Sequence, residues 1–308
     1  MADRTPLAVI PLVGAGGEPV HFAQTLRAHG LGYLPPNSID DRCTQLTTAL
    51  DLGGRVYPLR IVQRGAALAI GTNGRLPSAQ RRAQIVAQVR TVFSLDDDLS
   101  PLYARVADDE ALRWIRSGAG RLLRSPTAFE DVVRTICTTN CAWSGTERMI
   151  GALVRHLGAG GIAFPSAEAV AAADDTFFTG LARAGYRGPY LRELARRVAE
   201  REIDLEAWRA APGSELSDAQ LEERLRTLPG VGPYAAAHIM MLFGRHSRLV
   251  LDSWTRPTYA RLLGRKHVSD RTILRRFARY GSFAGLAFWM TLWRSRLRAV
   301  AGTADTGR

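Results

Sequence analysis

The feature that most constrains the fold of this chain is residues 228–242, LPGVGPYAAAHIMML. A Pro-Gly-Val-Gly turn precedes an almost wholly apolar run, which predicts a helix that is buried on all sides. A short helix is expected just before it, at 217–226, so the glycines permit a tight hairpin between two helices. The backbone N–H groups of Gly230, Val231 and Gly232 are then expected to face outward, where such donors bind a phosphate without reading sequence. The alternative is a plain helix–helix turn with a glycine stop.

The charge of the chain indicates a polyanionic partner. The sequence has 308 residues, of which 46% are hydrophobic, enough for one large or two ordinary domains with cores of their own. Its net charge is +12, which favours nucleic acid, with a merely solvated basic surface as the alternative. Nearly all the basic residues are arginine, because Lys266 is the only lysine. We therefore expect nucleic acid as the partner, and we expect the protein to be a monomer.

The sequence favours a cytoplasmic, nucleoid-associated protein without a disulfide framework or a zinc site. It contains no run of about 18 apolar residues, and its first residues have neither a basic lead nor a long apolar segment, so no membrane association is expected. Its three cysteines, Cys43, Cys137 and Cys141, form no Cys-x-x-Cys motif and no zinc spacing. Cys137 and Cys141 are expected to pack as small apolar residues.

The hydrophobic periodicity predicts an α+β, mainly α fold. Residues 44–72 alternate apolar and polar residues between glycine-containing turns, which predicts an antiparallel meander of three short strands after a short helix near 21–30. From "SAQRRAQIVAQVRTVFSL" onward the period is helical, and "AFEDVVRTICTTNCAW" carries one apolar stripe. The expected division is a small N-terminal α/β lobe with an antiparallel sheet, 1–92, and an all-α region, 93–308. Further helices are expected at 144–157, 166–173, 175–184, 188–200, 217–226, 233–243, 253–263, 269–279 and 282–298.

A second segment that bears on function is "RLVLDSWTRPTYARLLG", which contains the acidic residue Asp252 within the loop 248–254. Asp252 lies 18 residues beyond Tyr234, at the mouth of the helix expected at 253–263. Asp is a good N-cap for a helix, and capping is one reading of this residue. Catalysis is the other, and the two roles are compatible.

The hairpin and the spaced aspartate together resemble the helix-hairpin-helix DNA glycosylases, the superfamily of endonuclease III, 3-methyladenine DNA glycosylase II and the 8-oxoguanine glycosylases. The signature of that superfamily is L-P-G-[VI]-G, a central helix and an essential aspartate at about this distance, here within 217–243 and 248–254. "RLLRSPTAFEDVVRTICTTN", "AGYRGPYLRELAR" and "RRFARYGSFAGLAFWMTLW" resemble the entry helix, the middle segment and the closing helices. The N-terminal meander resembles the small sheet lobe of the 3-methyladenine and 8-oxoguanine branches.

The resemblance implies that the chain excises damaged bases from duplex DNA in base excision repair. Breaking the N-glycosidic bond builds positive charge on the deoxyribose, much as in glycoside hydrolysis. A carboxylate beside the anomeric carbon stabilises that charge and can orient or deprotonate the attacking water. Asp252 is the candidate for this catalytic role.

An enzyme of this kind must extrude the base and fill the gap that it leaves. The resemblance places Asn140 in the vacated space, and Tyr186 and Arg187 beside the orphaned partner base. For Asn140 the alternative is a helix-end cap, and for Tyr186 ordinary packing. The expected wall of the base pocket is made of two residues on the central helix and two from the closing helices, for all of which ordinary core packing is the alternative. These four residues are Tyr234, His238, Tyr280 and Phe288.

Departures from the family point to a subtype. Bifunctional members carry a Schiff-base lysine where this chain has Tyr234, so strand-cutting lyase activity is not expected. No cysteine follows Cys141, whereas the endonuclease III branch has four clustered cysteines beyond its aspartate, so no iron–sulfur cluster is expected. No cofactor is required, but the family implies a monovalent cation, K⁺ or Na⁺, held at the hairpin by the backbone carbonyls of Arg226, Leu228 and Val231.

The sequence thus predicts a monofunctional DNA glycosylase acting on alkylated purines of the 3-methyladenine type. A cationic base needs only an electron-rich aromatic pocket and leaves readily. An 8-oxoguanine glycosylase is the alternative, favoured by Asn140, Tyr186 and Arg187. Phe288, where that branch presents a glutamine, and Tyr234, where it has a lysine, argue against it. A helix-hairpin-helix DNA-binding protein without catalysis is the alternative of another class.

Overall fold

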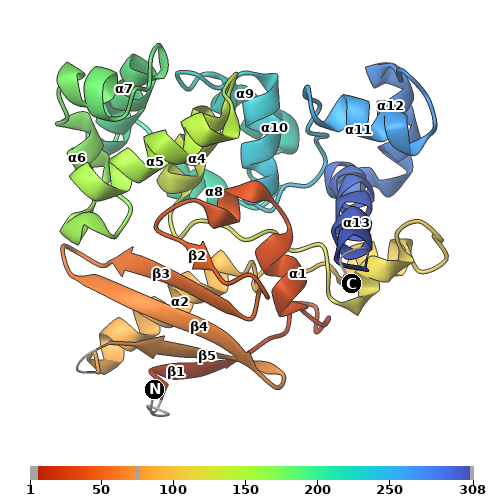
Figure 1. Ribbon diagram of the computed structural model, residues 1–308, viewed down its shortest axis with the longest axis horizontal. Helices are drawn as coiled ribbons and strands as arrows, with labels where there is room; N and C mark the ends of the chain where they lie inside the picture. Colours follow the sequence, from red (N-terminus) through yellow and green to blue (C-terminus); the bar gives the residue numbers. More distant parts are fainter. Residues whose placement is uncertain (1–5, 74–75, 306–308) are drawn as a thin grey trace.

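The computed structural model describes residues 6–73 and 76–305, and side chains up to residue 295. Figure 1 shows two layers, with an antiparallel sheet below and most of the helices above it. The sheet has five strands in the order β1-β5-β4-β3-β2. The predicted α+β, mainly α class is confirmed. The strands are β1 (Ala8–Pro11), β2 (Ser38–Ile39), β3 (Gln45–Asp51), β4 (Val56–Arg64) and β5 (Ala67–Thr72).

The predicted meander is the centre of this sheet. β3, β4 and β5 pair antiparallel with Leu46 opposite Ile61, and Ile61 opposite Ile70, and all three side chains are buried. The β3–β4 turn has positive φ at Gly53 and Gly54 (69° and 81°), a conformation that glycine adopts without a steric penalty. β1 and β2 add one strand at each edge, and the sequence did not predict them because two to four residues carry too little alternation.

The helices and short helical turns fall into three stretches of the chain. The N-terminal ones are α1 (Phe22–Arg27), η1 (Gly30–Tyr33), α2 (Ala79–Val92), α3 (Ser100–Arg105) and η2 (Arg113–Ser117). The middle ones are α4 (Ala128–Thr138), α5 (Trp143–Leu157), η3 (Ala159–Gly161), α6 (Ala167–Ala171), η4 (Phe177–Leu181), α7 (Arg187–Ala199) and α8 (Leu205–Ala210). The C-terminal ones are α9 (Asp218–Arg226), α10 (Pro233–Leu242), α11 (Thr255–Leu262), α12 (Asp270–Phe277), η5 (Ala278–Phe283) and α13 (Ala284–Asp305).

Two helices, α4 and α10, form the centre of the helical layer. Every residue of α10 from Ala235 to Leu242 is buried, as its apolar sequence predicts. α4 is buried as well, and its N-cap is Thr127, whose side chain accepts a hydrogen bond from the Glu130 amide at 3.2 Å. Each predicted helix corresponds to a helical element, whereas α3 and α8, of six residues each, were not predicted because they are too short to show a period.

The two layers have separate hydrophobic cores that one segment of the chain joins. The sheet packs with α1 and α2, while residues of η1 such as Leu31 belong to the core of the helical layer. Arg134 of α4 holds this segment: its guanidinium donates to the carbonyls of Leu31, Leu34 and Pro35 at 2.8–3.2 Å and pairs with Glu130. The polypeptide before β2 is thereby anchored against the helical layer. The division at residue 92 stays a prediction.

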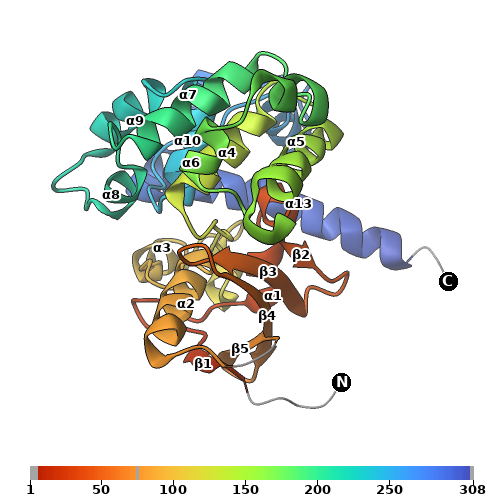
Figure 2. The same ribbon diagram turned by 90° about the vertical axis from the view of Figure 1, so that its left-hand side faces the viewer.

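The last helix, α13, passes along the helical layer and then extends beyond the body of the molecule (Figure 2). Within the residues that the structure describes, no helix combines the length and the apolarity needed to cross a membrane.

Candidate functional site

The predicted hairpin lies between α9 and α10. A capping box starts α9: the Ser217 side chain accepts from the Gln220 amide, and the Gln220 side chain accepts from the Ser217 amide. Gly230 has a φ of 77°, and a Cβ there would lie 2.9 Å from the ring of Tyr190, so both its conformation and its contacts require glycine. Gly232 is exposed and precedes α10, whose first turn has no side-chain cap. The Gly232 amide therefore stands at an exposed, uncapped helix start, as a phosphate site requires. The amide of Val231, which was predicted to face outward, instead donates to the carbonyl of Leu228 at 3.1 Å, and Val231 is buried.

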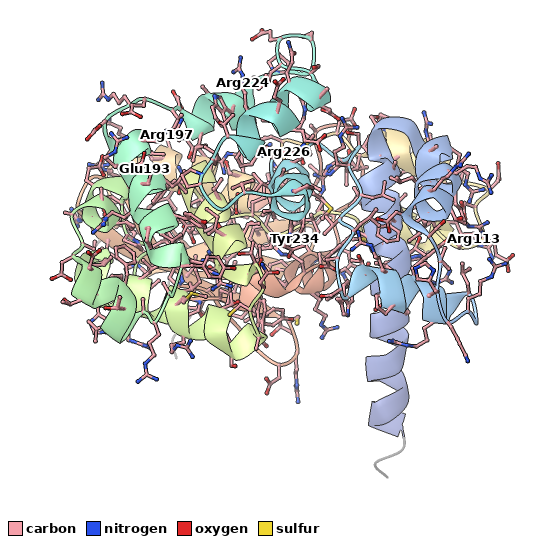
Figure 3. All side chains as sticks on the ribbon, turned by 90° about the horizontal axis from the view of Figure 1, so that it is seen from above. Arg113, Glu193, Arg197, Arg224, Arg226 and Tyr234 are labelled. Atoms are coloured by element: carbon pink, nitrogen blue, oxygen red, sulfur yellow. The ribbon has the colours of Figure 1, made fainter. Side chains whose placement is uncertain are left out.

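Arginines surround this hairpin. Arg224 and Arg226 are exposed at the end of α9, and the guanidinium of Arg197 lies 3.5 Å from the Thr227 carbonyl. Figure 3, which views the molecule from above, shows these three arginines in the upper part of the picture, with Tyr234 nearer its middle. The hairpin thus combines uncapped N–H groups with positive charge.

Asp252 caps α11. Its Oδ1 accepts hydrogen bonds from the amides of Trp254 at 2.8 Å and Thr255 at 2.6 Å, and the Thr255 hydroxyl accepts from the Asp252 amide at 2.8 Å. Among the described residues, Oδ2 accepts no hydrogen bond, so one oxygen is held by the helix while the other is available. The capping role predicted for Asp252 is therefore present, and it leaves the carboxylate able to act on a ligand.

Tyr234 is half-buried in the first turn of α10, near Asp252. Its hydroxyl is 3.3 Å from the Thr138 hydroxyl. Burial raises the pKa of Tyr234, the Thr138 hydrogen bond lowers it, and the negative charge of Asp252 raises it again. Tyr234 is thus close enough to Asp252 to sense its charge, and it is a neutral phenol at pH 7.

His238, one turn further along α10, belongs to a cluster of aromatic rings. Its imidazole lies 6.0 Å from the ring of Tyr234, 6.2 Å from that of His29 and 5.7 Å from that of Trp289, measured between centroids. The ring of Trp254 stands 5.7 Å from that of Trp289. Because Trp254 follows Asp252 in the same loop, the cluster and the carboxylate adjoin each other. We call these five residues the aromatic pocket, after the base-binding role predicted for Tyr234 and His238.

The two histidines of the pocket are uncharged. Burial, helped by the neighbouring His238, lowers the pKa of His29 to about 3, and burial alone lowers the pKa of His238 to about 4. His29 Nε2 is 2.6 Å from the carbonyl of Leu123, which can only accept, so Nε2 carries the proton and donates. Neither ring nitrogen of His238 has a hydrogen-bond partner among the described residues.

The predicted gap-filling residues come together at the end of α4. Asn140 Nδ2 lies 3.4 Å from the Tyr186 hydroxyl, and the Arg187 guanidinium stacks over the Tyr186 ring at 4.5 Å. Arg187 also donates to the carbonyl of Thr139. Asn140 has a φ of 44°, and Tyr186 is 51% exposed, which is unusual for an aromatic ring that serves only packing. Tyr190 connects this group to the hairpin because its ring packs over Gly230.

Tyr280 and Phe288 are not brought together with Tyr234 and His238. Phe288 is completely buried and packs against the rings of Tyr259 and Phe277. Tyr280 packs on Phe277, and its hydroxyl donates to Asp109 at 2.5 Å. Phe288 therefore joins α13 to α11 and α12, whereas Tyr280 joins η5 to α12 and to Asp109. The side chain that faces His238 from α13 is Trp289.

Three members of the aromatic pocket were not predicted. Trp254 stands two residues after Asp252, and its partial exposure in a loop is a signal that sequence reasoning could have used. Trp289 is the neighbour of Phe288 on α13, and helical register separates the residue that faces His238 from the one that was predicted to do so. His29 precedes η1 and lies more than 200 residues from His238 in the sequence; no local pattern connects them.

The cation expected at the hairpin stays a prediction. The carbonyl oxygen of Leu228 accepts a hydrogen bond from the Val231 amide at 3.1 Å, which leaves one of its two lone pairs for another ligand. Carbonyl oxygens suit a hard cation, so the backbone of Arg226, Leu228 and Val231 fits K⁺ or Na⁺ chemically. In the described part of the chain, no cluster of three or more His, Cys, Asp or Glu side chains could hold a metal ion.

Comparisons with known proteins agree with this geometry. No model of a known protein family matches the chain. A protein of Methanothermobacter thermautotrophicus named "Probable N-glycosylase/DNA lyase" is 27% identical over 226 residues, which cover 64% of this chain and 70% of the relative. The 3-methyladenine DNA glycosylase of Archaeoglobus fulgidus superposes with a TM-score of 0.72 at 18% identity, covering 94% of this chain and 98% of the other.

The 8-oxoguanine glycosylase/lyase of Clostridium acetobutylicum, in complex with duplex DNA containing cytosine opposite 8-oxoguanine, superposes with a TM-score of 0.68 at 20% identity, covering 91% of this chain and 93% of the other. Both solved structures extend over the sheet as well as the helical layer. The fold that the resemblance implied is confirmed: this chain has the same fold as these two DNA glycosylases.

Proposed function

We propose that this protein is a DNA glycosylase that extrudes a damaged base from duplex DNA and hydrolyses its N-glycosidic bond. The observation that carries the proposal is Asp252, whose Oδ2 is free beside an aromatic pocket while Oδ1 is held by the start of α11. The relative from Methanothermobacter, named an N-glycosylase, and the glycosylase fold support the same activity. A DNA-binding protein without catalysis would use Asp252 only as the cap of α11, for which one carboxylate oxygen is enough.

The roles of the residues follow from their positions. The hairpin amides and the arginines around it bind phosphates of the duplex. Asn140 enters the space vacated by the base, with Tyr186 and Arg187 beside the orphaned partner. As the base departs, Oδ2 of Asp252 stabilises the positive charge on the sugar and orients the attacking water. Oδ1 cannot rotate away without losing two hydrogen bonds, so the carboxylate is preorganised.

We further propose that the enzyme is monofunctional, although the relative from Methanothermobacter is named a lyase as well. Strand cleavage by the Schiff-base route needs a deprotonated amine at the sugar. Tyr234 stands where bifunctional members carry lysine, and its phenol cannot form an imine. Lys266 is exposed and follows the far end of α11 from Asp252; this helix of eight residues is about 12 Å long at 1.5 Å per residue.

The proposed substrate is an alkylated purine, because the aromatic pocket offers electron-rich rings and uncharged imidazoles. An 8-oxoguanine glycosylase is the second candidate, favoured by the cluster of Asn140, Tyr186 and Arg187. The test is base release from duplexes that each carry one lesion, followed by electrophoresis with and without alkali. Release of a base that leaves the strand intact until alkali is added supports the proposal. A protein that binds all these duplexes and releases no base would refute it.

A further inference from the structure

A cavity of about 360 Å³ lies at the end of α11 that is farther from Asp252. Residues of α11, α12 and α13 line it, and these three helices stand together on the right-hand side of Figure 1. Asp252 caps the start of α11, whereas Leu262 and Leu263 at its end line the cavity, and the eight residues of the helix span about 12 Å. Binding sites for small ligands measure about 300–1,000 Å³. This cavity, which we call the arginine cavity, therefore has the size of a ligand site of its own.

The arginine cavity is positively charged. The described residues that line it include Arg276, Arg279 and Arg294 and no aspartate or glutamate. Arg294 donates to two backbone carbonyls at 2.7 and 3.2 Å, which hold its guanidinium in place. Arg279 pairs with Asp109, which is not part of the lining, at 2.8 Å. Arg276 is exposed and forms no ion pair in the part of the chain that the structure describes. An anionic ligand would supply the negative charge that Arg276 lacks.

A buried hydroxyl adjoins these charges. Tyr259 lines the cavity and is 2% exposed, and its hydroxyl forms no hydrogen bond of standard geometry with any described residue. Burial raises the pKa of Tyr259, whereas the positive charges of Arg276, Arg279 and Arg265 lower it. Three guanidinium groups therefore act on the same buried hydroxyl. Because most buried polar groups are paired, an unpaired one next to these charges favours a ligand that accepts hydrogen bonds.

The mouth of the cavity favours a flat, apolar group on the same ligand. Leu262 and Leu263 are 44% and 41% exposed, and large apolar side chains side by side at a cavity are typical of binding sites. The guanidinium of Arg279 lies over the ring of Tyr280 at 4.8 Å, and its side chain is 59% exposed. One face of this guanidinium is thus covered by an aromatic ring, and the other face is open to a second flat ring. Guanidinium planes stack on the rings of bases as they do on aromatic side chains.

We propose that the arginine cavity is a second binding site, for a nucleotide that ends in a phosphate monoester. The phosphate pairs with Arg276, and the base lies on Leu262 and Leu263 against the guanidinium of Arg279. A phosphate monoester carries a charge of about −1.5 to −2 at pH 7 and three acceptor oxygens, so it satisfies several donors at once, more than a carboxylate can. The site does not depend on the proposed glycosylase activity, because it uses neither Asp252 nor the aromatic pocket.

The test measures the binding of dAMP, deoxyadenosine and inorganic phosphate by isothermal titration calorimetry at physiological ionic strength. The variant is Arg276→Gln, which removes the charge from the cavity. The matched control is Arg275→Gln, because Arg275 is the exposed neighbour on α12, loses the same charge and does not line the cavity. Thermal unfolding of each protein reports its folding.

We expect saturable binding of dAMP to the wild type, and binding of deoxyadenosine and of inorganic phosphate that is weaker by tenfold or more. Arg276→Gln should weaken dAMP binding by about tenfold, the effect of one lost hydrogen bond to a charged group. Arg275→Gln should keep the wild-type affinity. Equal losses in the two variants would show attraction to the general positive charge of α12 and would overturn the site. Inorganic phosphate that binds as tightly as dAMP would overturn the nucleotide as its ligand.

The phosphate monoester can belong to a free nucleotide or to the end of a DNA strand, and a second measurement separates these sources. Fluorescence anisotropy compares a short single strand of deoxyadenosines with and without a 5′-phosphate. A gain in affinity from the 5′-phosphate that Arg276→Gln removes and Arg275→Gln keeps assigns the site to DNA ends. Binding of dAMP without such a gain assigns it to free nucleotides. A wild type that binds no dAMP and gains nothing from the 5′-phosphate would refute the proposal, while the proposed glycosylase activity would stand.

Discussion

Replacing Asp252 by Asn separates the catalytic role of this residue from its structural role. An Asn side chain keeps an oxygen that accepts from the amides of Trp254 and Thr255, and Asn caps helices about as well as Asp. The free energy of unfolding should therefore change by no more than a few tenths of a kcal/mol. The negative charge beside the sugar is lost, and this loss is the only large consequence that we expect.

The size of the kinetic effect follows from the electrostatics of a half-buried carboxylate. Two unit charges about 4 Å apart interact by about 4 kcal/mol at an effective dielectric constant of 20. The sugar carries a full positive charge only when the bond is completely broken, and solvent screens part of Asp252. The charge of Asp252 therefore stabilises the transition state by at most about 3–4 kcal/mol. Each 1.36 kcal/mol is tenfold in rate, so Asp252→Asn should slow base release by about 10²–10³-fold.

The assay is single-turnover base release at saturating enzyme, with duplex binding and thermal unfolding measured on the same samples. Asp252→Ala should lose as much rate and, in addition, about 1 kcal/mol of stability, because its helix cap is gone. Asp204→Asn is the control: Asp204 also caps a helix, accepting from the Ala207 amide at 2.9 Å at the start of α8, and its replacement should leave the rate unchanged. If Asp252→Asn keeps more than about a tenth of the wild-type rate, Asp252 is not the main catalytic group.

Three further predictions concern DNA binding, strand cleavage and pH. Gly232→Asp should weaken binding to every duplex by a similar factor at moderate salt, because it places a carboxylate among the hairpin amides, and unchanged affinity would contradict the phosphate site. Borohydride added during the reaction should trap no more protein–DNA adduct than with Asp252→Asn, and a strong adduct that Lys266→Ala abolishes would show that the enzyme is a lyase. The thermal unfolding midpoint should fall as the pH is lowered from 6.5 toward 4. Burial holds the pKa values of His29, His238 and His246 at about 3, 4 and 4, so over this range these three histidines bind more protons in the unfolded chain than in the folded protein. Buried Asp131, with its pKa raised to about 6, and Glu130 oppose this trend by binding protons in the folded state, so a midpoint that rises over this range would show that the carboxyls dominate.

The features that the sequence predicted are those encoded by contiguous residues. The hairpin follows from the glycines and the apolar run at 228–242, and the cap at α11 follows from Asp252 directly before a helical period. The meander follows from strict alternation between glycine turns, as β3 to β5 bear out. Each of these depends on the local conformation of a few neighbouring residues, and local conformation is what spacing and residue type report.

The composition of the aromatic pocket was decided by the tertiary structure. Neighbouring residues on a helix point about 100° apart, so the exact rotation of α13 against α10 determines that Trp289 faces His238 while Phe288 packs behind it. His29 reaches the pocket because Arg134 binds the carbonyls of the segment that follows it and because Trp289 donates to Ala28. Contacts between residues so distant in the sequence arise from the packing of whole helices and strands. Patterns among neighbouring residues do not predict such packing.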